Sequence, residues 1–288
     1  MKKCLIVVNT YKTDSQLLAD SVSNFLEESG VKAEQYLFSG ECTTTSGVCN
    51  QKNPFESFDF SITLGGDGTV LFAARSCALL GIPVFPINLG QFGFIAGVQK
   101  TEWKEKLSEF LKGQMAFSTR SLVQSSVFRK GIQVFTSNAL NDVVISTSEA
   151  ARLVDLELSF DGISCGRFRA DGIIVATATG STAYSAAAGG PIIDPTMDLL
   201  LLNPVSPFSL SNRPLVLPPN GCLEAVIPFS RAKGITLSAD GQVNFHLEYE
   251  DRVEFSIAPE KVKLAGCSSP HFYNTLRSKL HWSGGLLA

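Results

Sequence analysis

The sequence has little charge, no excess of basic residues and no long hydrophobic run. Charged residues make up 18% of the 288 residues, too few for a disordered chain, and 24 basic residues stand against 27 acidic ones. Binding to nucleic acid or to an anionic membrane is therefore not expected. The first apolar stretch, residues 4–8, is too short for a signal-peptide core, and no later run approaches a membrane span. We expect a cytoplasmic protein that binds a small molecule.

Residue spacings typical of metal sites are also absent from the sequence. The seven cysteines are odd in number and include no C-x-x-C pair, so we expect free thiols in a reducing compartment. The three histidines, His246, His271 and His281, have no partner at metal-ligand spacing. We assign none of them a catalytic role, and no protein ligand to a metal.

The chain does contain enough apolar material for a large core, 44% of its residues. Its first part alternates apolar runs with amphipathic segments. Strands are expected at 4–8, 60–64 and 84–87, with helices at about 15–29, after a capping box at residues 13–16, and at 70–80. This alternation predicts a Rossmann-like α/β domain with a parallel sheet over residues 1–99.

The pattern changes after residue 100, where one more helix is followed by β-rich segments. Lys130-Gly131, Asp161-Gly162 and Asp240-Gly241 each lie between alternating apolar runs and predict hairpin turns. We expect a β-rich domain over residues 100–267. Residues 268–288 then form a tail that packs back on the first domain.

A glycine-rich turn follows the second predicted strand. It consists of Gly65, Gly66, Asp67, Gly68 and Thr69 and precedes a helix, where backbone N–H groups can hold phosphate. The three glycines let the chain adopt positive φ and let a ligand approach the backbone closely. Asp67 stands where other phosphate loops have a neutral residue or a lysine, which favours a role on an attacking hydroxyl in phosphoryl transfer. The alternative is a tight turn in which Asp67 only caps the helix.

Two further segments carry polar groups that suit a nucleoside. Asn141 and Asp142 place an amide beside a carboxylate, although a strand end or β-bulge is equally consistent with them. Residues 169–172 (Arg-Ala-Asp-Gly) precede a stretch, 177–191, of small and hydroxylated residues that lets a heterocycle approach, with Tyr184 available to stack. The alternative there is a helix start packed closely on a sheet.

Together these segments resemble the NAD kinase family. That family has, in this order, a GGDGT loop, an Asn-Glu/Asp pair, an ADG-x-x-x-A-T-P-T-G-S-T-A-Y-S stretch, an S-N-R-P segment and a late DGQ. The counterparts in this chain are residues 65–69, 141–142, 170–185, 211–214 and 240–242. The resemblance implies transfer of a phosphoryl group from ATP or polyphosphate to the 2′-hydroxyl of the adenosine ribose of NAD, giving NADP. It also implies a divalent metal such as Mg²⁺, a homo-oligomer (dimer or tetramer), and an α/β domain joined to a β-rich one.

The resemblance also implies roles for individual residues. Asp67, beside Gly68, would accept the proton of the ribose hydroxyl, Asn141 and Asp142 would bind the adenosine ribose, and Arg169 and Asp171 would lie near the nicotinamide. The phosphate loop would be Gly65, Gly66, Gly68 and Thr69. The other NAD-binding residues implied are Arg152, Thr182, Ala183, Tyr184, Ser185, Ala186, Ala187 and Gln242, with residues 182–187 lining the adenine pocket.

Two positions depart from the family pattern. Ala178 replaces the proline of A-T-P-T-G, which removes a fixed φ and can loosen the loop. Phe208 stands where a histidine commonly precedes Ser-Asn-Arg-Pro, so no polar role is expected there. Neither change removes a proposed catalytic group.

Two other functions share parts of these patterns. Enzymes similar to diacylglycerol kinase or phosphofructokinase also carry a GGDG turn, but the Asn141-Asp142 pair, the 179–185 run and the lack of a basic amphipathic segment argue against them. A dinucleotide sensor without chemistry is disfavoured by Asp67. Formation of NADP from NAD, ATP and magnesium would separate these alternatives.

Overall fold

The computed structural model of the protein forms two compact units. Unit 1 comprises Met1–Glu41, Asn53–Arg120 and Glu260–Ala288, and unit 2 includes Ser121–Pro259. The structure describes residues 1–40, 53–90, 93–148, 152–209, 211–228 and 234–280. Residues 281–288, the end of the predicted tail, lie outside these residues.

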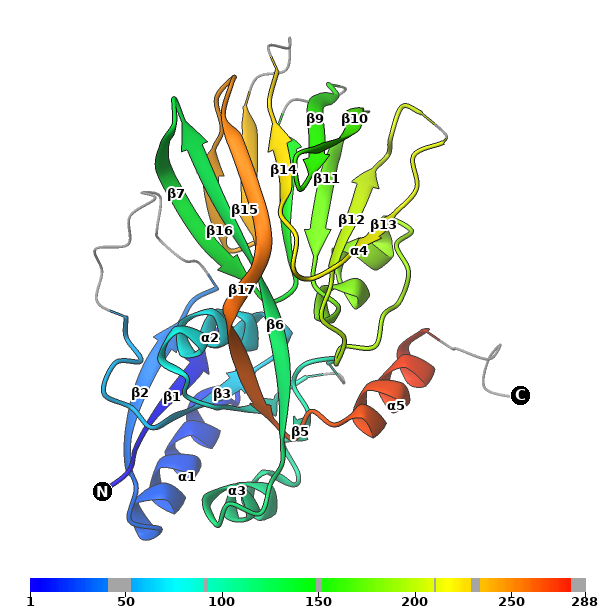
Figure 1. The fold of residues 1–288 in the computed structure, drawn as a ribbon. Helices are drawn as coiled ribbons and strands as arrows, with labels where there is room; N and C mark the ends of the chain where they lie inside the picture. Colours follow the sequence, from blue (N-terminus) through cyan, green and yellow to red (C-terminus); the bar gives the residue numbers. More distant parts are fainter. Residues whose placement is uncertain (41–52, 91–92, 149–151, 210, 229–233, 281–288) are drawn as a thin grey trace. The chain divides into compact units, whose positions relative to one another are not determined.

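Unit 1 contains a parallel sheet, which confirms the predicted α/β architecture (Figure 1). Its strands are β1 (Lys3–Asn9), β2 (Lys32–Phe38), β3 (Phe60–Gly65), β4 (Val84–Asn88) and β5 (Val98–Gln99). They lie in the order β2-β1-β3-β4, and β5 also pairs with β4. Ile6, Ile62 and Ile87 are almost completely buried, as expected for central strands of a sheet covered on both faces.

The helices of unit 1 follow the predicted order, with one local difference. They are α1 (Ser15–Glu28), α2 (Asp67–Leu80), α3 (Trp103–Leu111) and α5 (Ser269–Leu280). The predicted capping box before α1 is wrong, because the N-cap residue, Asp14, makes no side-chain capping hydrogen bond. Ser15 instead donates its hydroxyl to the carbonyls of Asn9 and Lys12, each at 2.7 Å, and so closes the turn that leaves β1.

The division into units differs from the boundaries expected from the sequence. Residues 100–120 and 260–267 belong to unit 1 rather than to the β-rich part. Helix α3 packs Leu107 into the hydrophobic cluster of the parallel sheet. The last long strand, β17 (Arg252–Ala265), leaves unit 2 and ends in unit 1, where Leu264 pairs in parallel with Val84 of β4. Amphipathic pattern alone did not reveal which core these segments join.

Unit 2 is built from antiparallel strands in two sheets. Its remaining elements are β6 (Phe117–Arg129), β7 (Ile132–Ala139), β8 (Asp142–Thr147), β9 (Val154–Phe160), β10 (Ile163–Ala170), β11 (Gly172–Ala176), the 3-10 helix η1 (Thr179–Thr182), α4 (Tyr184–Ala187), β12 (Leu200–Val205), β13 (Leu215–Leu217), β14 (Leu223–Val226), β15 (Ile235–Ala239) and β16 (Val243–His246). One sheet has the order β13-β12-β11-β8-β15-β16. The other contains β10-β9-β14-β17 and the β6–β7 pair.

The core of unit 2 lies between these two sheets. Buried side chains of both sheets, such as Leu156 and Phe255 from one and Ile145 and Val175 from the other, belong to a single hydrophobic cluster. Unit 2 is therefore a β-sandwich, in agreement with the β-rich domain predicted from the sequence.

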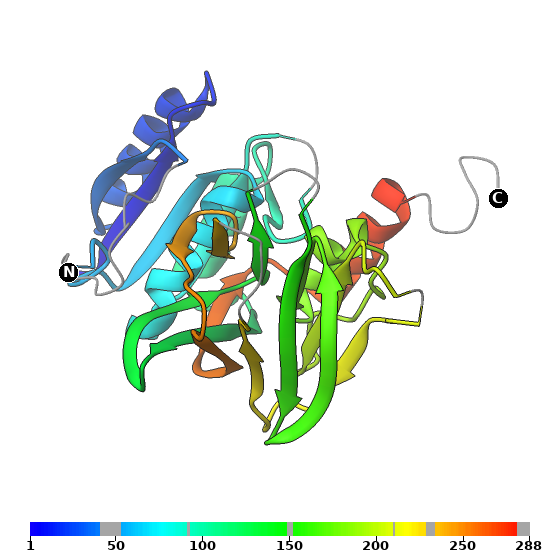
Figure 2. The ribbon, with the colours of Figure 1, turned by 90° about the horizontal axis from the view of Figure 1, so that it is seen from above.

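All three predicted hairpin turns are present. Lys130-Gly131 (φ 51° and 79°), Asp161-Gly162 (49° and 76°) and Asp240-Gly241 (51° and 65°) have both residues at positive φ. This geometry matches the right-handed twist of the flanking strands, which explains why a glycine occupies the second position of each turn. The β9–β10 hairpin, drawn in green, can be followed in the view from above (Figure 2).

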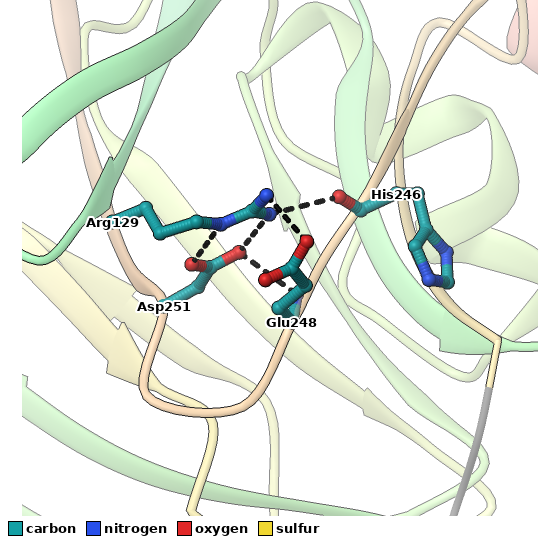
Figure 3. Close-up of polar contacts among 4 residues, drawn as sticks. All are labelled: Arg129, His246, Glu248 and Asp251. Atoms are coloured by element: carbon teal, nitrogen blue, oxygen red, sulfur yellow. Dashed lines mark hydrogen bonds and ion pairs between the residues drawn. The ribbon is translucent and has the colours of Figure 1, made fainter.

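An ion-pair cluster in unit 2 surrounds the buried carboxylate of Asp251 (Figure 3). The Arg129 guanidinium donates to both oxygens of Asp251, at 2.8 and 2.7 Å, and to Glu248 at 2.6 Å. Asp251 is fully buried and also accepts the N–H of Glu248 at 2.8 Å. The cluster fixes the turn between β16 and β17 against the end of β6, and we interpret it as structural.

Candidate active site

In unit 1 the glycine-rich turn joins β3 to α2. Gly65 ends the strand, Gly66 is the N-cap residue with φ −110°, and Asp67 is the first residue of the helix. Positive φ is not found at Gly65, Gly66 or Gly68, so this reason for the glycines is wrong. A side chain at Gly65 is instead excluded sterically, because a Cβ there would lie 2.2 Å from Oγ1 of Thr69.

The Asp67 side chain does not cap its own helix. Its carboxylate accepts backbone N–H groups from Phe94 at 3.1 Å, Ile95 at 3.3 Å and Ala96 at 3.1 Å. Gly93 packs against the same carboxylate, and a Cβ at this position would lie 2.1 Å from Asp67 Oδ1. The segment 93–96 thus surrounds and orients the carboxylate, which argues against the capping alternative.

The other residues of the predicted phosphate loop differ in exposure. Thr69 is buried, and its hydroxyl accepts a hydrogen bond from Asn9 Nδ2 at 3.0 Å, which ties the loop to the end of β1. Gly66 is partly exposed and Gly68 is exposed, both at the N-terminus of α2. Backbone N–H groups at a helix N-terminus can bind phosphate oxygens.

Unit 2 contains a cavity of about 390 Å³. It is lined by Asn141, Asp142, Val144, Ala183, Tyr184, Ser238, Asp240 and Gly241. Four of the residues predicted to bind the nucleoside therefore meet there, although they come from two segments about 40 positions apart in the sequence. The alternative of an ordinary strand end does not account for a cavity whose lining includes Asn141, Asp142 and Asp240.

Asp142 begins β8 and is buried in this cavity. Burial, followed by the nearby negative charge of Asp240, raises the pKa of its carboxyl group to about 7, while a hydrogen bond from the Tyr184 backbone N–H acts in the opposite direction. A carboxyl group with a pKa near neutrality can change its charge when a polar ligand arrives.

Asp240 is the residue that sequence reasoning missed. Its carboxylate accepts the N–H groups of Leu140 at 3.0 Å, Asn141 at 2.8 Å and Asp142 at 3.3 Å. Its own N–H donates to the Asp142 carbonyl at 2.9 Å. The sequence showed only an Asp-Gly hairpin turn, and the family pattern marked the DGQ segment, but neither revealed that this side chain holds the Asn141-Asp142 pair.

The hydroxyl-rich stretch after β11 is close-packed, and two of its residues, Ala183 and Tyr184, also line the cavity. Thr177 donates its hydroxyl to the Leu140 carbonyl at 2.6 Å. A Cβ at Gly180 would lie 1.9 Å from the Asn141 carbonyl oxygen, so only glycine allows this approach. The stretch therefore packs directly against the backbone that carries the Asn141 side chain.

Several predicted NAD-binding residues of this stretch lie outside the cavity lining. Ser185 is buried, and its carbonyl and hydroxyl accept hydrogen bonds from Asn203 Nδ2 at 2.9 and 3.3 Å. Thr182 donates to the Thr179 carbonyl at 3.2 Å. Ala186 is partly exposed and Ala187 is exposed on α4. Thr182 and Ser185 thus have structural contacts within the stretch.

The residues predicted near the nicotinamide also lie apart from this lining. Arg169 on β10 forms an ion pair with Asp155 at 3.1 Å, and its guanidinium lies 5.8 Å from the ring centre of Phe208. Phe208, the departure from the family histidine, therefore stacks on an arginine. Asp171 is exposed between β10 and β11. Arg152 is exposed and Gln242 is partly exposed after the Asp240-Gly241 turn.

Sequence comparison matches both units to known proteins. Family models described as "ATP-NAD kinase N-terminal domain" and "ATP-NAD kinase C-terminal domain" match residues 4–115 and 140–266. An NAD kinase of Treponema denticola is 48% identical over 284 residues, covering 99% of this chain and 98% of that protein. The chain belongs to the NAD kinase family. It is therefore an enzyme that phosphorylates NAD to NADP with ATP, which confirms the function predicted from the sequence.

Solved structures of NAD kinases share this fold. A yeast NADH kinase complexed with NADH has a TM-score of 0.84 at 22% identity and covers 99% of this chain and 89% of its own. An NAD kinase from Archaeoglobus fulgidus in complex with ATP has a TM-score of 0.72 at 24% identity, with coverages of 95% and 96%. No helix among the described residues combines the length and apolar character needed to span a bilayer.

Proposed function

We propose that this NAD kinase binds the adenosine ribose of NAD in the unit 2 cavity and uses Asp67 to accept the proton of the 2′-hydroxyl. The observation that carries the first part is a buried hydrogen-bond acceptor on a residue of the cavity lining. Among the residues that the structure describes, Asn141 Oδ1 is buried without a hydrogen-bond partner, and it belongs to a cavity-lining residue. A buried acceptor of this kind is costly unless a ligand donates to it.

The neighbouring groups fit a nucleoside. When ionised, Asp142 can accept hydrogen bonds from two adjacent ribose hydroxyls. Tyr184 lines the cavity, is 47% exposed and offers a flat ring surface to the adenine. Ala183 leaves space beside it. In this proposal Asn141 recognises the adenosine by its amide, and Asp240 keeps both polar residues in place.

The remaining predicted residues have supporting roles in the proposal. Arg169 and Asp171 serve the nicotinamide side of NAD, and Arg152 and Gln242 are further NAD-binding residues. Thr182 and Ser185 shape the adenine pocket through the hydrogen bonds described above, with Ala186 and Ala187 beside them on α4. Gly65, Gly66, Gly68 and Thr69 form the loop that binds phosphate at the start of α2.

Asp67 suits the chemistry because phosphoryl transfer demands little basicity until late in the reaction. The transition state is loose, with charge spread over the oxygens of the moving phosphoryl group. The 2′-oxygen attacks the γ-phosphorus, the bond to the β-phosphate oxygen breaks, and ADP leaves with that bonding pair. The hydroxyl proton passes to the Asp67 carboxylate. The backbone N–H groups of residues 94–96 orient this carboxylate before the substrate binds.

In this proposal magnesium binds together with the phosphoryl donor. Within the described part of the chain, no group of three or more His, Cys, Asp or Glu residues forms a metal-binding set. The hard oxygens of a triphosphate are natural ligands for Mg²⁺. We also propose polyphosphate as an alternative donor, a dimer or tetramer, and a cytoplasmic location. The five cysteines that the structure describes are all free, which supports a reducing compartment.

One assay tests the activity and another tests the site. Purified enzyme is incubated with NAD or NADH and with ATP or polyphosphate, each with and without magnesium, and NADP(H) is measured. We expect magnesium-dependent formation of NADP from NAD and ATP. Asn141→Ala should then raise the KM for NAD about tenfold with little change in kcat, because a bound-state hydrogen bond is lost. An unchanged KM would remove the cavity from NAD binding.

A further inference from the structure

The three N–H groups that hold Asp67 belong to planar peptide groups whose carbonyls point the opposite way. The Phe94 N–H shares its peptide group with the Gly93 carbonyl, and the Ala96 N–H shares its peptide group with the Ile95 carbonyl. A hydrogen-bond donor that fixes either carbonyl therefore also fixes the direction of the N–H group that the same peptide presents to Asp67.

Both carbonyls accept hydrogen bonds from one segment near the C-terminus. His271 Nε2, on α5, lies 3.2 Å from the Gly93 carbonyl oxygen. The Cys267 thiol donates to the Ile95 carbonyl at 2.8 Å, with a longer contact of 3.5 Å to the Ala265 carbonyl. Cys267 is buried and His271 is partly buried, so water competes little for these contacts.

We propose that Cys267 and His271 are positioning residues for the Asp67 carboxylate, acting through the two peptide groups between them. Each side chain hydrogen-bonds to a carbonyl oxygen. The N–H group of the same peptide points in the opposite direction and is thereby directed at Asp67. A donor on the carbonyl also polarises the peptide and strengthens the hydrogen bond made by its N–H. This inference depends on the proposed role of Asp67 as proton acceptor.

The surroundings keep both donors in place. The Phe272 ring lies 6.0 Å from that of Phe94, and Lys279 Nζ lies 5.4 Å from the Phe94 ring centre. The Arg120 guanidinium donates to the Cys267 carbonyl at 3.1 Å. Helix α5 is thus packed on the segment that it positions.

His271 has the protonation state needed for this role. Burial lowers the pKa of its ring, with a smaller lowering effect from Arg120, while the Gly93 hydrogen bond, Asp67 and Glu102 raise it. The ring is therefore neutral at neutral pH. Because the Gly93 oxygen can only accept, the proton must lie on Nε2.

The test begins with substitutions that remove or restore the donor. His271→Leu should lower kcat about tenfold and leave the KM for NAD within about twofold, since only positioning for the chemical step is lost. His271→Gln places an amide nitrogen close to the position of Nε2 and should recover most of the turnover. In the same way, Cys267→Ala removes the second donor and should lower kcat, and Cys267→Ser keeps a donor and should recover most of the turnover. Asn274→Ala, an exposed change on α5, is the control and should leave both constants unchanged.

A double mutant distinguishes positioning from general destabilisation. In an Asp67→Asn background, His271→Leu should cause no further loss of kcat, because the group through which it acts is already gone. An equal loss in both backgrounds, or an unchanged kcat in His271→Leu alone, would overturn the proposal.

Amide hydrogen exchange provides a readout that does not depend on activity. The amides of Phe94 and Ala96 should exchange faster in His271→Leu and Cys267→Ala, respectively, while amides of β11 in unit 2 stay unchanged. Unchanged exchange at both sites would overturn the inference. If Asp67→Asn retained full turnover, the proposed function of Asp67 would fail, whereas the exchange experiment would still decide whether the C-terminal segment orients these peptides.

Discussion

Each unit contains a carboxylate surrounded by three consecutive backbone N–H groups. In unit 1 Asp67 accepts from residues 94–96, and in unit 2 Asp240 accepts from residues 140–142. The folds that produce these two arrangements differ. Asp67 lies at the start of a helix that follows a parallel strand, and Asp240 lies in a hairpin turn between antiparallel strands.

The two carboxylates differ in what they orient. Asp67 is itself the proposed proton acceptor, so its N–H groups orient the reacting group directly. Asp240 orients Asn141 and Asp142, and its charge contributes to the raised pKa of Asp142. In the proposed function, the same backbone arrangement supports proton transfer in one unit and ligand recognition in the other. Substitutions in unit 1 should change kcat, and those in unit 2 should change the KM for NAD.

The largest effect is expected for Asp67→Asn. The amide keeps the shape of the side chain but cannot accept the hydroxyl proton, so kcat should fall on the order of a thousandfold while NAD affinity is retained. Turnover by NADP formation and NAD binding by calorimetry measure the two quantities. Asp14→Asn, which removes an exposed ion pair with Lys100 in the same unit, is the matched control. Normal turnover in Asp67→Asn would exclude this residue as the base.

Gly93→Ala should have the next largest effect. The added Cβ would lie 2.1 Å from Asp67 Oδ1, so the carboxylate has to move. A displacement of about 1 Å at a reacting group can cost about a hundredfold in rate, and we expect a loss of kcat of this order. Thermal unfolding of the variant checks that the fold persists. If kcat stayed normal while the KM for NAD rose, the difference between the two units would not hold.

The sequence predicted the architecture of both carboxylate sites better than their contacts. Continuous apolar runs and Asp-Gly pairs report local backbone preference, and so the strands around Asp67 and the hairpin at Asp240 were predicted correctly. The contact between Asp67 and residues 94–96 joins positions 27 to 29 residues apart, and the contact between Asp240 and Asn141 spans 99. No local pattern encodes such long-range contacts.

The glycines illustrate the same limit. Gly65 and Gly180 were noticed in the sequence as parts of small-residue motifs, and positive φ was the expected reason for the first. Both are instead required because another atom occupies the space of a Cβ, Thr69 Oγ1 in one case and the Asn141 carbonyl in the other. Close approach depends on tertiary packing, which a single sequence does not display.

Asp240→Asn should have a smaller effect, confined to NAD binding. One side-chain oxygen remains to accept N–H groups, but the new amide nitrogen faces a backbone donor, which we expect to cost about 1–3 kcal/mol. The KM for NAD should rise about tenfold with kcat little changed. A matched change at a different hairpin, Asp161→Asn, removes the same charge at an equivalent turn outside the cavity. Equal effects in both variants would remove the special role of Asp240.

The smallest effect is a proton released when NAD binds. The pKa of Asp142 is about 7 because burial and Asp240 disfavour its ionised form. Ribose hydroxyls donate to that ionised form, so NAD should lower the pKa and bind more tightly as the pH rises through about 7. Calorimetry at pH 7 in two buffers of different ionisation enthalpy should detect release of a fraction of a proton.

The variant Asp240→Asn sharpens this last measurement. Removing the neighbouring negative charge should lower the pKa of Asp142 in the free enzyme, which moves proton release to lower pH and reduces it at pH 7. Asp67→Asn, in unit 1, should leave the release unchanged. If the Asp67 variant altered proton release as much as the Asp240 variant, the protons would not come from Asp142, and the assignment of ligand recognition to the unit 2 cavity would be wrong.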